Sequence, residues 1–257
     1  YIGTSTMEAS LDVQSMSETS TKVFILEVMG RHAGWMAASS ALARTNKEAA
    51  PHVILLPETI FNQKEFLSLV KNNVNEHGYC VVVVSEGVKN SKGKFLAESD
   101  KKDAFGHSQL GGVAPFISNL INNKLKLKNH WAVADYLQRS ARHIASKVDL
   151  EHAQAVGSFA IKYAMAGMNG VMPIIIRKKG SKYKWFIEAA PLSKIANLEK
   201  KLPKSFISKN GMNVTQKAID YLMPLIQGES HPPFKNGIPL LKAFKLKKVK
   251  KKLPNWK

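Results

Sequence analysis

The sequence predicts an α/β fold of three layers, in which crossover helices cover both faces of a parallel, Rossmann-like sheet. Three apolar runs of strand length, at residues 23–28, 52–56 and 80–84, alternate with segments of helical periodicity. Parallel neighbours need a long connection between them, usually a helix, so this alternation is typical of a parallel sheet. We expect a helix from Tyr1 ahead of the first strand.

The clearest helix lies between the second and third strands. Asn62 can cap its first turn, Phe66, Val70 and Val74 share one face, and Gly78 can end it. This helix is the expected crossover between two parallel strands.

The chain after the third strand is less regular, but its elements can still be ordered. Residues 90–107 are rich in lysine, glycine and aspartate and indicate a long exposed loop. We then expect a helix over residues 112–122, a basic connector over 124–130, a helix capped by Asp149 that ends near Gly167, a hairpin of strands 171–177 and 183–189, and a short helix over 216–226.

Composition limits the possible classes of protein. The chain has 257 residues with 44% hydrophobic content, which is enough for a sizeable core. Its single cysteine, Cys80, excludes an internal disulfide framework and a cysteine-based metal site. No apolar run approaches the roughly 20 residues needed to span a bilayer, and no signal segment begins the sequence. We therefore expect a cytoplasmic protein without a membrane partner.

The net charge of +19 is unevenly distributed, and residues 242–252 alone contain seven lysines. We divide the chain into a folded portion, residues 1–241, and a lysine-rich tail, residues 242–257. A tail of this kind can bind nucleic acid, and a non-catalytic basic binding module is the competing function. Apolar residues interleave with the lysines, however, which favours a solvated, partly docked segment and makes nucleic acid an unexpected partner.

The strand 23–28 runs directly into the turn Met29-Gly30-Arg31. In open parallel sheets, ligands are held at the carboxyl ends of the strands, next to the following helices. Arg31 in that position suggests a phosphate-bearing ligand, since guanidinium groups bind phosphate oxygens through paired hydrogen bonds. Arg139 fits the same task. Glu86, which follows the third strand, can accept hydrogen bonds from sugar hydroxyls.

Three ordered blocks resemble the phosphofructokinase family. The block 27–35, Glu-Val-Met-Gly-Arg-His-Ala-Gly-Trp, is similar to the family's signature, whose Met-Gly-Arg turn holds fructose 6-phosphate. Ser85-Glu86-Gly87 matches its sugar-binding glutamate, and 135–140, Asp-Tyr-Leu-Gln-Arg-Ser, resembles its second phosphate-binding turn in the form of the pyrophosphate-using branch. The resemblance thus implies a substrate-binding set of Met29, Gly30, Arg31, Glu86, Tyr136, Leu137, Gln138 and Arg139, in which Leu137 and Gln138 contribute backbone and spacing.

The resemblance also implies a reaction, the phosphorylation of fructose 6-phosphate to fructose 1,6-bisphosphate in glycolysis, with Mg²⁺ required. The expected donor is pyrophosphate, and ATP is the alternative. The family's donor loop, general base and magnesium carboxylate would lie upstream of residue 1, so we expect a fold incomplete at its amino terminus, no catalytic or metal-binding residue in this chain, and no turnover by the chain alone.

Family members reach across subunits, which implies a homodimer or homotetramer. Lys22 aligns with a position from which many of them contact a neighbour's phosphate. His130 stands where the family has a second arginine of this kind, so that contact is a departure from the family pattern.

Overall fold

A computed structural model describes residues 1–46, 48–102, 108–110, 112–180 and 182–242, together with residues 245, 247 and 250–252. Its centre is a four-stranded sheet in the order β2-β3-β1-β6. The strands are β1 (Val23–Val28), β2 (Val53–Leu55), β3 (Cys80–Ser85) and β6 (Asn129–Val133), and all neighbours pair in parallel. The predicted parallel sheet is confirmed.

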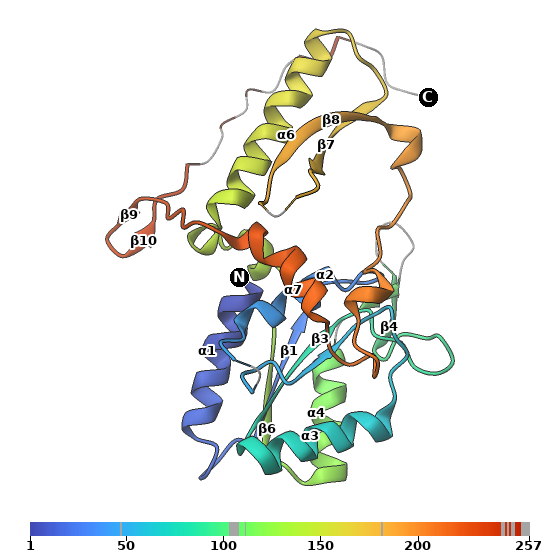
Figure 1. The fold of residues 1–257 in the computed structure, drawn as a ribbon, viewed down its shortest axis with the longest axis vertical. Coiled ribbons are helices and arrows are strands. Elements are labelled where there is room, and N and C mark those ends of the chain that lie inside the picture. The colour runs from blue at the N-terminus through green and yellow to red at the C-terminus, as the bar shows by residue number, and fades with distance from the viewer. Residues whose placement is uncertain are drawn as a thin grey trace.

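Helices cover both faces of this sheet, as predicted (Figure 1). Alternate strand residues such as Ile25 and Val82 pack against α3 (Gln63–His77) and α4 (Val113–Leu125). Residues of the opposite parity, such as Leu26 and Val83, belong to a second core with α1 (Ile2–Ser15), α2 (Trp35–Ser39) and α7 (Gln216–Leu222). The alternation follows from the pleat of a strand, which directs successive side chains to opposite faces.

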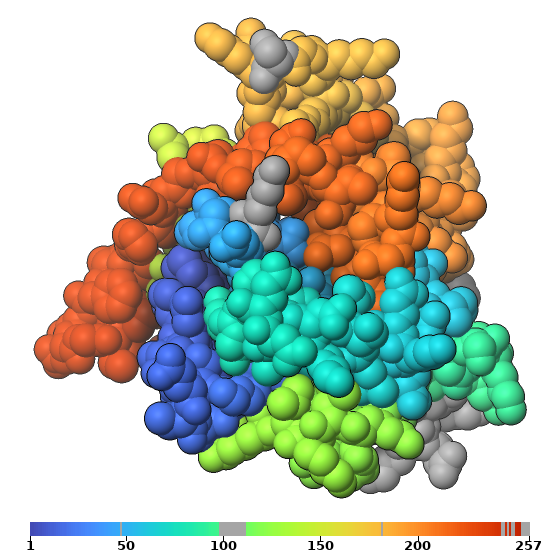
Figure 2. Space-filling view, turned by 60° about the horizontal axis from the view of Figure 1, so that its bottom comes forward, coloured from blue at the N-terminus to red at the C-terminus, as the bar shows by residue number. Residues whose placement is uncertain are grey.

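A second body, which we call the upper lobe, stands apart from the sheet (Figure 1). It consists of α6 (Lys147–Met165) packed on the antiparallel hairpin of β7 (Val171–Arg177) and β8 (Trp185–Pro191). The hairpin was predicted, but the second strand was expected to start two residues before β8 begins. Figure 2 shows α3 and α4 side by side on the surface, with the orange segment that follows β8 between them and the upper lobe.

The chain returns from the upper lobe through short elements. They are 3₁₀ turns at Leu192–Lys194 and Lys204–Phe206, then α7 with its 3₁₀ extension Met223–Ile226, and a small hairpin of β9 (Phe234–Lys235) and β10 (Ile238–Pro239). Arg177 ties the lobe to this path, because its guanidinium donates to the Tyr221 carbonyl at 2.7 Å and lies over the rings of Tyr183 and Tyr221.

Two of the predicted irregular segments contain strands. The basic connector 124–130 runs into β6, which pairs with β1 through its backbone. Its first residues, Asn129 and His130, are polar and do not indicate a strand. The predicted loop 90–107 contains β4 (Glu98–Lys102), which pairs with β5 (Ser108–Leu110). Residues 103–107 lie outside the described residues. Backbone pairing needs no apolar side chains, so neither strand left a periodic signal.

The caps of two helices test the local predictions. The side chain of Asn62 accepts a hydrogen bond from the Glu65 amide, and Gly78 ends α3 with a left-handed φ of 81°, both as predicted. The predicted cap of α6 is wrong: Ser146, not Asp149, occupies that position and accepts from the Asp149 amide at 3.1 Å. Asp149 lies in the first turn instead, where a carboxylate is favoured by the helix dipole.

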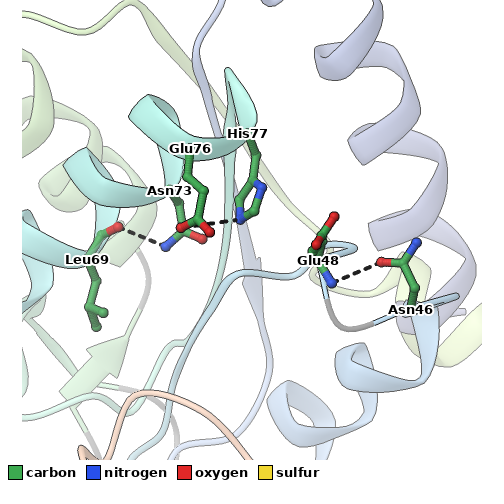
Figure 3. A network of polar contacts seen from close by, with 6 residues as sticks. All are labelled: Asn46, Glu48, Leu69, Asn73, Glu76 and His77. Atoms are coloured by element: carbon green, nitrogen blue, oxygen red, sulfur yellow. Dashed lines mark hydrogen bonds and ion pairs between the residues drawn. The ribbon is translucent and has the colours of Figure 1, made fainter.

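Histidine and tyrosine rings pack together at the end of the central sheet where its strands begin. His52 stacks on His77 with ring centroids 5.4 Å apart, and its Nδ1 accepts a hydrogen bond from the Val81 amide. Burial, with smaller contributions from His77 and Arg44, lowers the pKa of His52 to about 4. Figure 3 shows His77 facing Glu76, 3.9 Å away, with the Asn46–Glu48 turn nearby. His52 is therefore neutral in the folded protein near pH 7.

We expect His52 to make stability depend on pH. Its ordinary pKa is near 6.5, so between pH 6.5 and 4 the unfolded chain binds a proton that the folded chain does not. The contribution of His52 to the free energy of unfolding should therefore be fully present above pH 6.5. It should fall as the pH drops towards 4, by at most about 3 kcal/mol. Urea unfolding of the wild type and of His52→Asn at several pH values measures this contribution.

Asparagine places an amide oxygen near the position of Nδ1 and can keep the bond from Val81 without titrating. The stability difference between wild type and His52→Asn should shrink from pH 7 to pH 4.5. A difference that stays constant over this range would contradict the assignment.

Two turns approach each other closely at the carboxyl end of the sheet. Gly30 has a φ of 144°, and a Cβ there would lie 2.8 Å from both the Ala33 carbonyl and Ser85 Oγ. A Cβ on Gly87 would lie 1.9 Å from the Arg31 carbonyl oxygen. Since the obstructing atoms at Gly87 are backbone, no side-chain rotation can make room.

Gly87→Ala should therefore lower the free energy of unfolding by about 3 kcal/mol, the upper end of the usual cost of overpacking. Urea denaturation measures it. The matched control is Gly157→Ala in α6, where a Cβ would meet nothing within 4 Å. Alanine in a helix interior should stabilise by about 0.5–1 kcal/mol, so the two substitutions should have opposite signs. A neutral Gly87→Ala would show that the turns can separate freely.

Candidate acceptor-binding site

Three turns meet at the carboxyl end of the sheet. They follow β3, β1 and β6, which are neighbours in the sheet, so the turns that carry the predicted residues lie next to one another. Residues 29–31 lie in the middle, with residues 85–87 on one side and 134–139 on the other. Ligands of parallel sheets bind at such an edge.

The middle turn is held by hydrogen bonds from both sides. The Gly30 amide donates to Glu86 Oε1 at 3.1 Å, and Ser85 Oγ donates to the Gly30 carbonyl at 2.6 Å. From the other side, the Met29 amide donates to Gln138 Oε1 at 3.3 Å. The predicted residues Met29, Gly30, Glu86 and Gln138 therefore form one connected unit. Ser85, which sequence reasoning passed over, belongs to it.

Gln138 does more than supply spacing. Its side chain is only 8% exposed, and its Nε2 donates to the Asp135 carbonyl at 2.8 Å while its Oε1 accepts from Met29. Beyond the backbone and spacing expected of it, its side-chain amide joins the turn after β6 to the turn after β1. Leu137 beside it is 63% exposed and has no such contact in the part of the chain that is described.

The two predicted arginines are available to an anion. In the described part of the chain, the Arg31 side chain has neither a hydrogen bond nor an ion pair, although the residue is half-buried. Arg139 is exposed and lies over the ring of Tyr136, 4.2 Å from its centroid. Tyr136 itself is 62% exposed. Among the described residues no carboxylate pairs with either guanidinium, so an anionic ligand could serve as their counterion.

A buried carboxylate joins β1 to the start of α4. Glu27, in β1, is 2% exposed and accepts a hydrogen bond from the Ala114 amide at 2.8 Å, at the start of α4. Burial raises its pKa, the amides at the helix start oppose this, and the nearby Glu86 adds to the increase. Sequence reasoning missed Glu27, although one acid in an otherwise apolar strand was a usable signal.

The helix that follows the turn is held by a segment from far along the chain. His32 Nδ1 pairs with Glu199, and the Trp35 indole donates to the Lys200 carbonyl at 2.7 Å. His32 also stacks on Phe95, with ring centroids 6.1 Å apart. These contacts place His32 in the frame of the site, where it joins the turn to residues 199–200.

Lys22 lies at the other end of β1. Its ammonium donates to the Ser17 carbonyl, and the six residues of β1 separate it from Arg31 by about 20 Å at the usual rise of a strand. It cannot share a small ligand with Arg31 of the same chain. Its contact with a neighbouring subunit stays a prediction, as does the effect of His130, which pairs with Phe24 near that same end.

The described residues contain no group of three or more His, Cys, Asp or Glu side chains that could hold a metal ion. They also contain no helix with the length and hydropathy needed to cross a membrane.

The chain is similar to proteins of known family. Residues 4–164 match the phosphofructokinase family. A pyrophosphate--fructose 6-phosphate 1-phosphotransferase of Halomonas elongata is 52% identical over 100% of this chain and 61% of its own length. Another from Methylococcus capsulatus is 53% identical over 93% of this chain and 57% of its own length. The chain thus spans about three fifths of these relatives.

Solved structures show the same fold. The pyrophosphate-dependent phosphofructokinase of Marinobacter aquaeolei is 51% identical, with a TM-score of 0.87 over 99% of this chain and 60% of that chain. The phosphofructokinase of Saccharomyces cerevisiae, 18% identical with a TM-score of 0.52, shares the fold alone. With matching blocks, fold and relatives in agreement, this chain belongs to the phosphofructokinase family.

Proposed function

We propose that the whole protein is a pyrophosphate-dependent phosphofructokinase, and that this chain carries its acceptor site. The reaction moves a phosphoryl group from pyrophosphate to the 1-hydroxyl of fructose 6-phosphate, giving fructose 1,6-bisphosphate and phosphate. The observation that supports it best is the placement of two guanidiniums, Arg31 and Arg139, and the carboxylate of Glu86 on the turns that follow three neighbouring strands. Among the described residues, neither guanidinium has a carboxylate partner.

Each group has a separate task in this proposal. Arg31 and Arg139 hold the 6-phosphate, which carries about two negative charges, through charge-assisted hydrogen bonds. Glu86 uses one oxygen on the Gly30 amide, and its other oxygen accepts from a sugar hydroxyl. The bonds from Ser85, Glu86 and Gln138 fix the turn before the ligand arrives. Preorganisation of this kind reduces the entropy lost on binding.

The donor is the part of the proposal that this chain supports least directly. Pyrophosphate is favoured because the relatives about 50% identical carry that name, and ATP remains the alternative. We assign the donor site and the general base to the part of the relatives' length that this chain does not span. Mg²⁺ would neutralise charge on the transferring phosphate there. The described residues offer no metal site, so no step is assigned to the ion here.

The working form of the enzyme is a homodimer or homotetramer in the cytoplasm, in which Lys22 reaches the phosphate of a neighbouring subunit. The position of Lys22 at the end of β1 remote from Arg31 supports this role, since only another subunit's site could use it. A monomer by light scattering of the active enzyme would contradict it.

Arg139→Ala in the whole enzyme should weaken fructose 6-phosphate binding by about 2–5 kcal/mol, the scale for removing one partner of a close charge pair. The reason is that the 6-phosphate would lose one of its two guanidinium partners. Steady-state kinetics with varied fructose 6-phosphate measures it. The control Lys71→Ala removes a positive charge from the exposed surface of α3 and should leave the apparent affinity unchanged. An unchanged affinity in Arg139→Ala would refute the assignment.

The purified 257-residue chain should not turn over. Loss of a general base alone costs roughly 10²–10⁴-fold, and the donor site is assigned elsewhere. A coupled assay for fructose 1,6-bisphosphate, with pyrophosphate and with ATP in separate reactions, tests this. Bisphosphate formed in either reaction would place the catalytic groups within these 257 residues.

A further inference from the structure

Glu58 holds two distant pieces of backbone with one carboxylate. It follows β2 after Leu56 and Pro57, and its Oε1 accepts hydrogen bonds from the Gly34 amide at 2.9 Å and the Leu202 amide at 2.8 Å. Its Oε2 is buried without a hydrogen-bond partner among the described residues. A buried carboxylate normally needs several partners, so the geometry at this position is strongly constrained.

Gly34 lies so close to this carboxylate that a side chain would not fit between them. A Cβ at Gly34 would lie 2.7 Å from Glu58 Oε2 and 2.8 Å from Leu56 Cδ2. Glycine therefore lets the backbone come close enough for the bond to Oε1. Gly34 lies three residues after Arg31, so the position of its amide limits where the arginine can be.

Residues 199–202, which we call the strap, are joined to the same turn at neighbouring points. Glu199 pairs with His32, the Lys200 carbonyl accepts from Trp35, and the Leu202 amide shares Glu58 with Gly34. Leu202 is 3% exposed and belongs to the core formed with α2 and α7. The contact through Glu58 joins the turn and the strap to the segment that follows β2.

We propose that Glu58 is a positioning residue of the acceptor site, which sets the place of the Arg31–Trp35 turn by holding Gly34 and the strap at a fixed distance from β2. This inference rests on the proposed function, because Arg31 is the phosphate-binding group it positions. Glu58 does not touch the substrate in this arrangement and acts through the backbone.

The test compares three variants of the whole enzyme. Glu58→Ala removes both bonds and should raise the KM for fructose 6-phosphate roughly 10- to 100-fold, the scale for misplacing a binding group by about 1 Å, with a much smaller change in kcat. Glu58→Asp shortens the side chain by one methylene and should fall between. Glu58→Gln keeps one carbonyl oxygen for both amides and should restore a KM within about threefold of wild type.

A second measurement does not depend on activity. Hydrogen exchange of the Gly34 and Leu202 amides should accelerate in Glu58→Ala and stay slow in Glu58→Gln. The matched control is Glu76→Ala, which removes an exposed carboxylate at the opposite end of the sheet (Figure 3) and should change neither the KM nor these amides.

The outcomes separate the two proposals. If the wild-type enzyme does not use fructose 6-phosphate, the proposed function fails, while the exchange data still test the hold on Gly34. If it does, an unchanged KM in Glu58→Ala overturns the positioning role. The role is also overturned if Glu58→Gln is impaired as much as Glu58→Ala, or if Glu58→Ala lowers only thermal stability. Should Glu58→Ala not fold, Glu58→Asp and Glu58→Gln carry the same comparison.

Discussion

The contact between the turn after β1 and the turn after β3 is the constraint on which this site depends. Parallel pairing sets the two strand ends side by side, but only the absence of side chains at Gly30 and Gly87 lets the backbones touch. Once they touch, Ser85 and Glu86 can each bond Gly30. This contact holds the turn that carries Arg31 at its Gly30 end.

The polar side chains that surround this contact mostly bind backbone rather than one another. Glu27 binds the start of α4, Glu58 binds Gly34 and Leu202, and Gln138 binds Met29 and Asp135. A buried carboxylate that accepts amide hydrogen bonds avoids part of its desolvation cost. The frame of the site is therefore built from acids and amides, none of which pairs with Arg31 or Arg139 in the part of the chain that the structure describes.

The sequence revealed the features that depend on near neighbours. Asn62, Gly78 and the apolar strands act within a few residues, so the fold class and the crossover helix followed from local pattern. Choosing Asp149 over Ser146 failed because both are capping residues three positions apart, and only the path of the chain distinguishes them. β6 could not be recognised from its own residues, since its pairing with β1 defines it. The role of Glu58 depends on a partner 144 residues away, and no local sequence pattern indicates a contact over that separation.

The strap has a consequence for synthesis on the ribosome. Gly34 and Glu58 are made before the strap, and the Leu202 amide follows Glu58 by 144 residues. At about 5–20 residues per second this is a delay of about 7 to 30 s. Over that interval the carboxylate lacks one of its two donors, and the core that later receives Leu202 is still open. The Glu58 hold on the Arg31–Trp35 turn therefore stays incomplete until the upper lobe has been translated.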